Sequence, residues 1–239
     1  MVANGVSRQT GQDYSPVMHR LYHLWLSPFC RKIRVAMAEK KLEFELVVEK
    51  VWDRREAFLA LNPSGQVPVL EIAGGPILAD SGAISEYLEE VYPDPNLLGR
   101  NAEARAETRR LVAWFDQKFN AEVTSMLVHQ KITKRLLSLG EPDSMAIRAG
   151  NTNIHLHMEY VAWLTEDRRW LAGDEFSLAD IAAAAHFSCV DYLGDVPWEE
   201  HPRAKDWYAR IKSRPSFRGI LGDHIPGYPP PKHYADLDF

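Results

Sequence analysis

Ser27 and Cys30 are the residues of this chain whose types and spacing are best suited to thiol chemistry. Ser27 is predicted to cap a helix that begins at Pro28, because serine is a preferred N-cap and proline is tolerated in the first helical turn. Cys30 would then lie in that first turn, near unpaired backbone N–H groups and the positive end of the helix. Arg31 and Lys32 add positive charge, so the pattern favours a thiolate at Cys30.

Two interpretations of this stretch remain open from the sequence. In the first, the cysteine is a small core residue in a capped helix and is chemically inert. In the second, Ser27 and Cys30 form a thiol or hydroxyl site at the end of a thioredoxin-like strand, where Ser27 replaces the first cysteine of a C-x-x-C pair. Residues further along the chain must decide between them.

Two downstream pairs of residues could complete a binding site. Val67 and Pro68 precede an apolar strand expected at 69–72, and proline is tolerated where a strand opens. A cis bond there would turn the backbone polar groups of Val67 outward, toward an extended peptide ligand. Asp80 or Ser81 is predicted to cap the next helix. That helix start is either an ordinary N-cap or a carboxylate site, since helix N-termini bind anions.

The elements that must position these residues alternate between strands and helices as far as residue 92. Apolar runs, β-branched alternation and turn dipeptides predict them. Their expected order is a strand from 21, a helix from 28, a strand at 44–48, a helix at 56–61, a hairpin of strands at 69–72 and 77–79, and a helix from 81.

After a cluster of helix breakers at 92–96, the remaining segments have helical periodicity. Helices are expected at 102–137, 153–165, 181–190 and 202–213. Ser177 and Asp180 stand in capping-box spacing. The helix that they start is apolar nearly all round, so it should be buried at the centre of its domain.

Composition and charge exclude several classes of function. The 239 residues are 46% hydrophobic and 26% charged, which is typical of a folded protein of one or two domains. A net charge of −5 argues against a nucleic-acid binder. Two cysteines and no apolar run of membrane-spanning length favour a cytoplasmic protein without membrane insertion. His155 and His157 point to different faces of a helix, so no metal site is expected.

The order of elements resembles the glutathione S-transferase fold from about Met18 to Leu221. The motifs that carry the resemblance are Ser-Pro-Phe-Cys at 27–30, Asn-Pro-Ser-Gly-Gln-Val-Pro-Val-Leu at 62–70, Asp-Ser at 80–81 and Phe-Ser-Leu-Ala-Asp at 176–180. The resemblance implies an α/β thioredoxin-like domain, then an all-α helical-bundle domain, in a homodimer. The expected divisions are a flexible extension at 1–17, the thioredoxin-like domain at 18–92, a linker at 93–101, the helical domain at 102–221 and a proline-rich tail at 222–239.

The resemblance also implies roles for the candidate site residues. Val67, before a cis Pro68, would pair with the cysteinyl backbone of glutathione, and Asp80 with Ser81 would hold its γ-glutamyl end. Ser27 would stabilise the glutathione thiolate, whereas Cys30 would form mixed disulfides. Asp80 is shorter than the glutamate usual in the family, and Trp25-Leu26 adds bulk before Ser27. We therefore expect a vestigial pocket, with no cofactor or weakly bound glutathione.

The tail departs from the common family pattern. Its prolines predict an extended spacer that presents a partner-binding peptide made of Tyr234, Asp236, Leu237, Asp238 and Phe239. On this interpretation, removal of the chain from Tyr228 onward leaves stability unchanged. The alternative, that the tail packs back on its own domain, stays open.

This tail on this body resembles glutathione-transferase-like division proteins of bacteria that bind the tubulin-like polymer FtsZ. The resemblance implies a non-enzymatic adaptor at the division site, which binds FtsZ filaments and affects their curvature or bundling. The alternative is a glutathione-dependent transferase or thiol reductase that acts on small electrophiles through Ser27 or Cys30. The tail favours the adaptor, and the motifs at Val67-Pro68 and Asp80-Ser81 favour the enzyme.

Overall fold

The computed structural model describes residues 18–237, and the extension expected at 1–17 lies outside them. Within the described residues, the strands form one sheet in the order β2-β1-β3-β4. β1 pairs in parallel with β2 and antiparallel with β3, which pairs antiparallel with β4. The strands are β1 (His19–His23), β2 (Phe44–Val48), β3 (Val69–Glu71) and β4 (Ile77–Leu78). The strands and the hairpin predicted from the sequence are thus present, with small differences at their ends.

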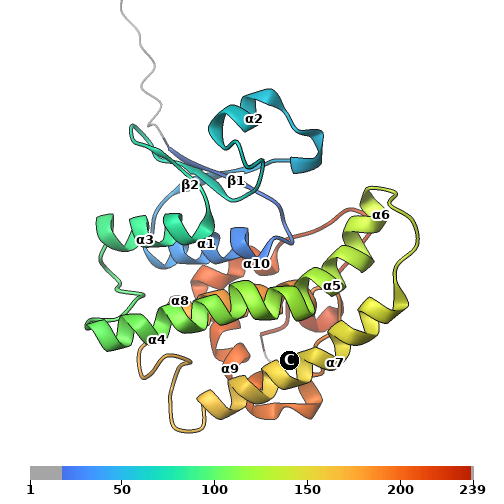
Figure 1. Ribbon diagram of the computed structural model, residues 1–239. Coiled ribbons are helices and arrows are strands. Elements are labelled where there is room, and N and C mark those ends of the chain that lie inside the picture. Colours follow the sequence, from blue (N-terminus) through green and yellow to red (C-terminus); the bar gives the residue numbers. More distant parts are fainter. Residues whose placement is uncertain (1–17, 238–239) are drawn as a thin grey trace, which may run out of the picture.

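Helices cover both faces of this sheet. α1 (Pro28–Glu39) and α3 (Ser81–Val91) lie between the sheet and the rest of the molecule, and α2 (Glu56–Leu61) lies on the opposite face (Figure 1). Ile33 of α1 and Ile84 of α3 are fully buried in the core, as their helical spacing predicts. This half of the chain has the expected thioredoxin-like fold.

The second half is helical throughout. Its first element is one unbroken helix built from α4 (Ala102–Ala113), a π-helical segment (Trp114–Thr124), α5 (Ser125–Val128), a second π-helical segment (His129–Thr133) and α6 (Lys134–Leu136). The helices that follow are α7 (Ser144–Leu164), α8 (Leu178–Asp191), α9 (Pro202–Lys212) and α10 (Arg218–Leu221). Among the described residues, none of these helices is long and apolar enough to cross a membrane.

Two helix starts in this domain follow from local capping. The predicted capping box of Ser177 and Asp180 is present, and every residue of α8 is buried, as expected. α7 begins well before the predicted position 153, because the side chain of Asp143 accepts hydrogen bonds from the first turn and supplies an N-cap. N-cap residues therefore explain why α8 begins where the sequence predicts and why α7 begins earlier than predicted.

The tail folds back on the body, which contradicts the expectation of a free spacer. Tyr234 is fully buried, and its hydroxyl donates a hydrogen bond to the carbonyl oxygen of Ile220 at 3.1 Å. Its ring lies edge-on to Tyr192 of α8, with centroids 5.1 Å apart. Burial of a large aromatic side chain outweighs the extended preference of the prolines before it. Tyr234 is therefore a core residue and not part of a recognition peptide.

The other residues of the predicted recognition peptide are placed differently. Asp236 is exposed and Leu237 is half-buried, while Asp238 and Phe239 lie outside the described residues. The tail passes α6, where the guanidinium of Arg135 lies over the ring of Tyr228 at 5.1 Å (Figure 1). The tail thus contacts the body at several points before its last described residue.

A buried ion cluster joins the tail to the first domain. Asp223 accepts from Arg31 at 3.1 Å and from both terminal nitrogens of Arg34 at 2.8 Å. Arg31 also donates to the backbone oxygen of Trp25 at 2.7 Å and to Ser188 of α8 at 2.9 Å. One carboxylate therefore holds two buried guanidinium groups between α1 and the helical domain, where removal of a partner is costly.

Candidate functional site

Ser27 lines a large cavity between the two domains. Its hydroxyl oxygen accepts the backbone N–H of Cys30 at 3.3 Å, which confirms the predicted N-cap. Since the oxygen is the acceptor in this bond, its hydrogen is available to a ligand. The cavity is about 570 Å³ in volume and is lined from the first domain by Leu24, Leu26, Ser27, Pro28, Phe29, Val51, Gln66 and Val67.

Cys30 is not activated, which corrects the predicted thiolate. The side chain is fully buried, and burial raises the pKa of its thiol to about 11. The neighbouring cations do not offset this effect, because Arg31 pairs with Asp223 and Lys32 pairs with Asp116. The thiol is protonated at neutral pH, so the first interpretation of this cysteine, an inert core residue, is the one that the structure supports.

A smaller cavity adjoins the first one. It is about 260 Å³ in volume, and its lining includes Val67, Pro68 and Asp80. Gln66 and Val67 line both cavities, and the Val67–Pro68 peptide bond is cis. The structure thus brings Ser27, Val67, Pro68 and Asp80 along one continuous groove, as the sequence motifs predict.

The side chain of Asp80 caps the helix that follows it, α3. Its carboxylate accepts the backbone N–H groups of Gly82 at 2.7 Å and Ala83 at 3.1 Å, at the start of α3. These are the donors that a bound carboxylate would need, so the ordinary N-cap interpretation holds. Ser81 is buried and does not line either cavity. The start of α3 therefore offers a ligand fewer hydrogen-bond donors than the sequence motif implied.

Trp25 does not crowd Ser27, contrary to the expectation from its bulk. Its ring lies edge-on to His23, with centroids 4.5 Å apart, and beneath the guanidinium of Arg34 at 5.5 Å. Of the two bulky residues before Ser27, it is Leu26 that lines the large cavity. The strand end therefore leaves the serine accessible to a ligand.

His23 makes the protein sensitive to acid. It is fully buried, neither ring nitrogen has a hydrogen-bond partner, and burial next to Arg34 lowers its pKa from 6.5 to about 4. The unfolded chain takes up this proton between pH 6.5 and 4, while the folded chain does not. The free energy of unfolding should therefore decrease as the pH is lowered from 6.5 toward 4. By pH 4.5 the decrease caused by this group should be on the order of 2 to 3 kcal/mol.

Urea titrations at pH 7 and pH 4.5 test this expectation. In His23→Leu the difference in the free energy of unfolding between pH 7 and pH 4.5 should shrink by that amount. The substitution of leucine at the exposed His129 should leave this difference as in the wild type. Equal pH dependence in the wild type and His23→Leu would contradict it.

Sequence reasoning missed a buried polar cluster on the other side of the large cavity. Thr124 and His186 share a hydrogen bond of 3.0 Å, His186 faces Asp116 at 3.4 Å, and Asp116 pairs with Lys32. The signal that could have revealed it is polarity out of place. His186 interrupts the apolar α8, and Asp116 lies beside Phe115 in a core helix.

The described residues contain no group of three or more His, Cys, Asp or Glu side chains arranged to hold a metal ion.

Comparison with known proteins identifies the family. Residues 26–91 match the model of the glutathione S-transferase N-terminal domain, and residues 156–215 match the model of its C-terminal domain, together more than half of the chain. The chain belongs to the glutathione S-transferase family.

Among relatives of this glutathione S-transferase family member, FtsZ-localized protein A of Caulobacter vibrioides is 46% identical over 226 residues, which cover 93% of this chain and 99% of the relative. The structure of FzlA from C. crescentus is also 46% identical, with a TM-score of 0.90 over 93% of this chain and 100% of the other. A glutathione S-transferase from Rhodospirillum rubrum is 61% identical, with a TM-score of 0.92 over the same shares. The expected fold is confirmed, and the relatives include both an FtsZ-localized protein and a glutathione S-transferase.

Proposed function

We propose that this chain is a non-enzymatic adaptor of cell division, which associates with FtsZ filaments in the cytoplasm at the division site and affects their curvature or bundling. One observation carries the proposal: the chain matches FtsZ-localized protein A at 46% identity over nearly the whole length of both proteins. Asp236, which is exposed, together with Leu237, Asp238 and Phe239 remains our candidate for a contact with a partner.

Two features of the groove support a role without thiol chemistry. The thiol of Cys30 is buried with a pKa of about 11, so it cannot serve as a nucleophile at neutral pH. The carboxylate of Asp80 occupies the N–H groups that would hold the γ-glutamyl carboxylate of glutathione. Loss of one charge-assisted contact weakens binding by roughly ten- to a hundredfold. Glutathione is therefore expected to bind weakly.

A second candidate function is a glutathione-dependent transferase that acts on small electrophiles. The observation that favours it is the hydroxyl of Ser27, which lines the 570 Å³ cavity and has its hydrogen available to stabilise a thiolate. Cys30 is unsuitable for the corresponding thiol reductase. Ser27 would thus be the catalytic residue of this alternative.

One purified sample tests both candidates. For the adaptor, we expect the protein to co-pellet with GTP-assembled FtsZ polymer and to pass through immobilised glutathione without retention. Cys30→Ala and Ser27→Ala should co-pellet as the wild type does, because an adaptor binds the polymer without using the chemistry of either side chain. Retention on glutathione that is lost in Ser27→Ala, together with no co-pelleting, would reject the adaptor in favour of the transferase.

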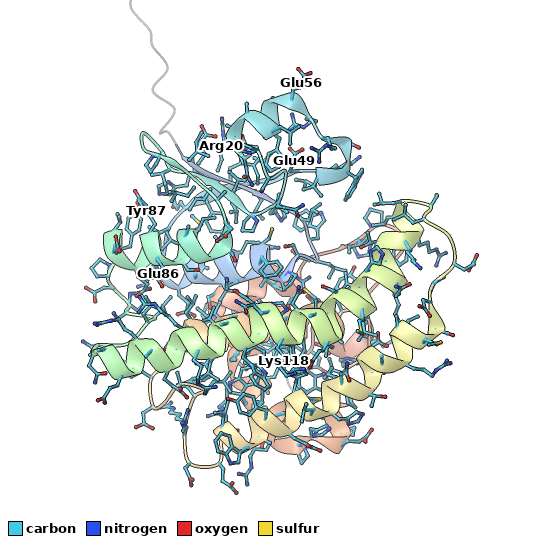
Figure 2. All side chains as sticks on the ribbon, in the orientation of Figure 1. Arg20, Glu49, Glu56, Glu86, Tyr87 and Lys118 are labelled. Atoms are coloured by element: carbon cyan, nitrogen blue, oxygen red, sulfur yellow. The ribbon has the colours of Figure 1, made fainter. Side chains whose placement is uncertain are left out.

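We further propose that the chain forms a homodimer through an exposed aromatic surface on the helical domain. Trp163 is 62% exposed on α7 and stacks on Tyr160, which packs against Trp114. Lys118 lies over Trp114 at 5.6 Å, on the front of the long helix in Figure 2. Exposed aromatic clusters of this kind commonly form protein interfaces. A dimer would present two FtsZ-binding faces and so could bridge filaments.

Sedimentation or light scattering tests the dimer. The wild type should have twice the 27.2 kDa mass of the chain at micromolar concentration, and Trp163→Glu should shift it toward the monomer because a carboxylate would be desolvated in the interface. Met145→Glu is the matched control, since Met145 is 71% exposed outside this surface. A wild type that remains a monomer would remove the bridging model.

A further inference from the structure

Two imidazole rings join α7 to the start of α9. Nδ1 of His155, in the middle of α7, lies 2.9 Å from Nε2 of His201, and the ring centroids are 5.1 Å apart. His201 immediately precedes Pro202, the first residue of α9, and its carbonyl oxygen accepts the backbone N–H of Lys205 at 3.0 Å. Both histidines are half-buried, so their rings can exchange protons with solvent. The pair is therefore a titratable contact between two helices.

The number of protons on the two rings decides whether this contact can form. A hydrogen bond between two ring nitrogens needs a hydrogen on one of them and a lone pair on the other. Two neutral imidazoles meet this condition, and so do one imidazole and one imidazolium. Two imidazolium rings do not, because every ring nitrogen then carries a hydrogen and the two positive charges repel each other. The second proton therefore breaks the bond between His155 and His201, whichever ring takes up the first.

Two carboxylates lie close enough to pair with the rings once this bond is broken. Glu200, in the single 3₁₀ turn Trp198–Glu200, has a carboxylate oxygen 3.9 Å from Nδ1 of His155. Glu159 is exposed and follows His155 by one turn on the same face of α7. Burial and the charge of His155 lower the pKa of His201 below 6.5, whereas Glu159 and Glu200 act in the opposite direction. The two rings thus have a second set of partners in their charged forms.

Two ion pairs flank the contact. Arg203 of α9 lies 3.4 Å from Glu166, just beyond the end of α7, and Lys205 pairs with Glu199 at 2.6 Å. None of these four residues is of a type that ordinarily titrates between pH 5 and pH 7. Histidines are the side chains that do so, which leaves His155 and His201 as the groups that respond to pH here.

We propose that His155 and His201 form a pH-dependent switch between α7 and the start of α9. The contact is closed while at most one of the two rings is charged. It opens when both are charged and each turns to one of the two glutamates. Opening is confined to the first turn of α9, because the fully buried Trp207, Tyr208 and Ile211 hold the rest of that helix in the core. This inference does not depend on FtsZ binding.

Hydrogen exchange at the amide of Lys205, followed by NMR on the full chain, tests the switch. The protection factor is corrected for the intrinsic pH dependence of exchange. Between pH 7.5 and pH 5 it should fall roughly three- to tenfold in the wild type, the value of one hydrogen bond. His201→Gln keeps a hydrogen-bonding group that does not titrate, so it should lose no protection at this amide.

The matched control is His224→Gln, at an exposed histidine outside the pair, which should lose as much protection as the wild type. His23 is present in every sample, so its effect on global stability cancels in the comparison. Imidazole ¹⁵N spectra of the wild type need no variant. They should show the two rings of the pair taking up their protons in steps separated by about one pH unit or more.

Three results would overturn the proposal. The first is a Lys205 protection factor that is the same at both pH values in the wild type. The second is an equal loss of protection in His201→Gln and the wild type, since the opening would then have another cause. The third is uptake of both protons at one common pH, which would show that the two rings do not share a hydrogen bond.

Discussion

A chain cut after Gly227 is expected to melt roughly 10 °C below the full-length protein. The cut removes Tyr234, whose ring is fully buried against Tyr192, and loss of such a ring costs about 3 to 5 kcal/mol. It also removes the carbonyl of His233, which accepts from the buried ammonium of Lys212 at 2.6 Å. For a chain of this size, 1 kcal/mol corresponds to roughly 2 to 4 °C. Scanning calorimetry measures the shift.

The matched control separates the ring from its hydroxyl. Tyr234→Phe keeps the packing and loses the hydrogen bond to Ile220, so it should cost about 1 kcal/mol. An unchanged melting temperature in the truncated chain would show that the tail adds no packing energy, and would restore the free spacer expected from its prolines.

Asp223→Ala should lower the free energy of unfolding by about 3 to 5 kcal/mol. The substitution leaves Arg31 and Arg34 buried with no carboxylate, and the cost of an unpaired buried charge exceeds that of the lost contacts. Urea unfolding at pH 7 measures it directly, and the m-value reports whether the folded state stays equally compact.

An exposed ion pair provides the comparison. Glu45 pairs with Arg20 on the sheet, and both side chains are more than half exposed. Glu45→Ala should therefore cost less than about 1 kcal/mol. If both substitutions had similar effects, the two arginines would not depend on Asp223, and solvent would have to reach them.

Local signals explain how much of this fold could be predicted. Ser27 and Ser177 cap their helices as expected, because an N-cap depends on residues within three positions of each other. Glycine pairs and breaker clusters likewise mark turns without reference to distant residues. Local signals do not bring distant residues together; it is the family resemblance, which covers both domains, that implies a shared site for Ser27, Val67, Pro68 and Asp80, and these residues line two adjoining cavities.

The errors concern where long side chains point. Arg31 and Lys32 follow Cys30 in sequence, yet their charges meet carboxylates 192 and 84 positions away. Composition shows neither these pairings nor the complete burial of Cys30, which raises the pKa of its thiol, and the thiolate prediction failed for both reasons. The prediction of a free tail failed for a similar reason, since no residue near Tyr234 in the sequence indicates that its ring packs beside Tyr192.

The pairing of α1 with the tail also orders events while the protein is being made. Arg31 and Arg34 emerge from the ribosome early, whereas their shared carboxylate at Asp223 follows 192 and 189 residues later. Until then, burial of α1 against α8 would enclose two charges without a counterion, so the nascent first domain must keep that face of α1 in water. Docking of the two domains therefore belongs to the end of synthesis, and a ribosome stalled before Asp223 should carry a chain whose domains remain undocked.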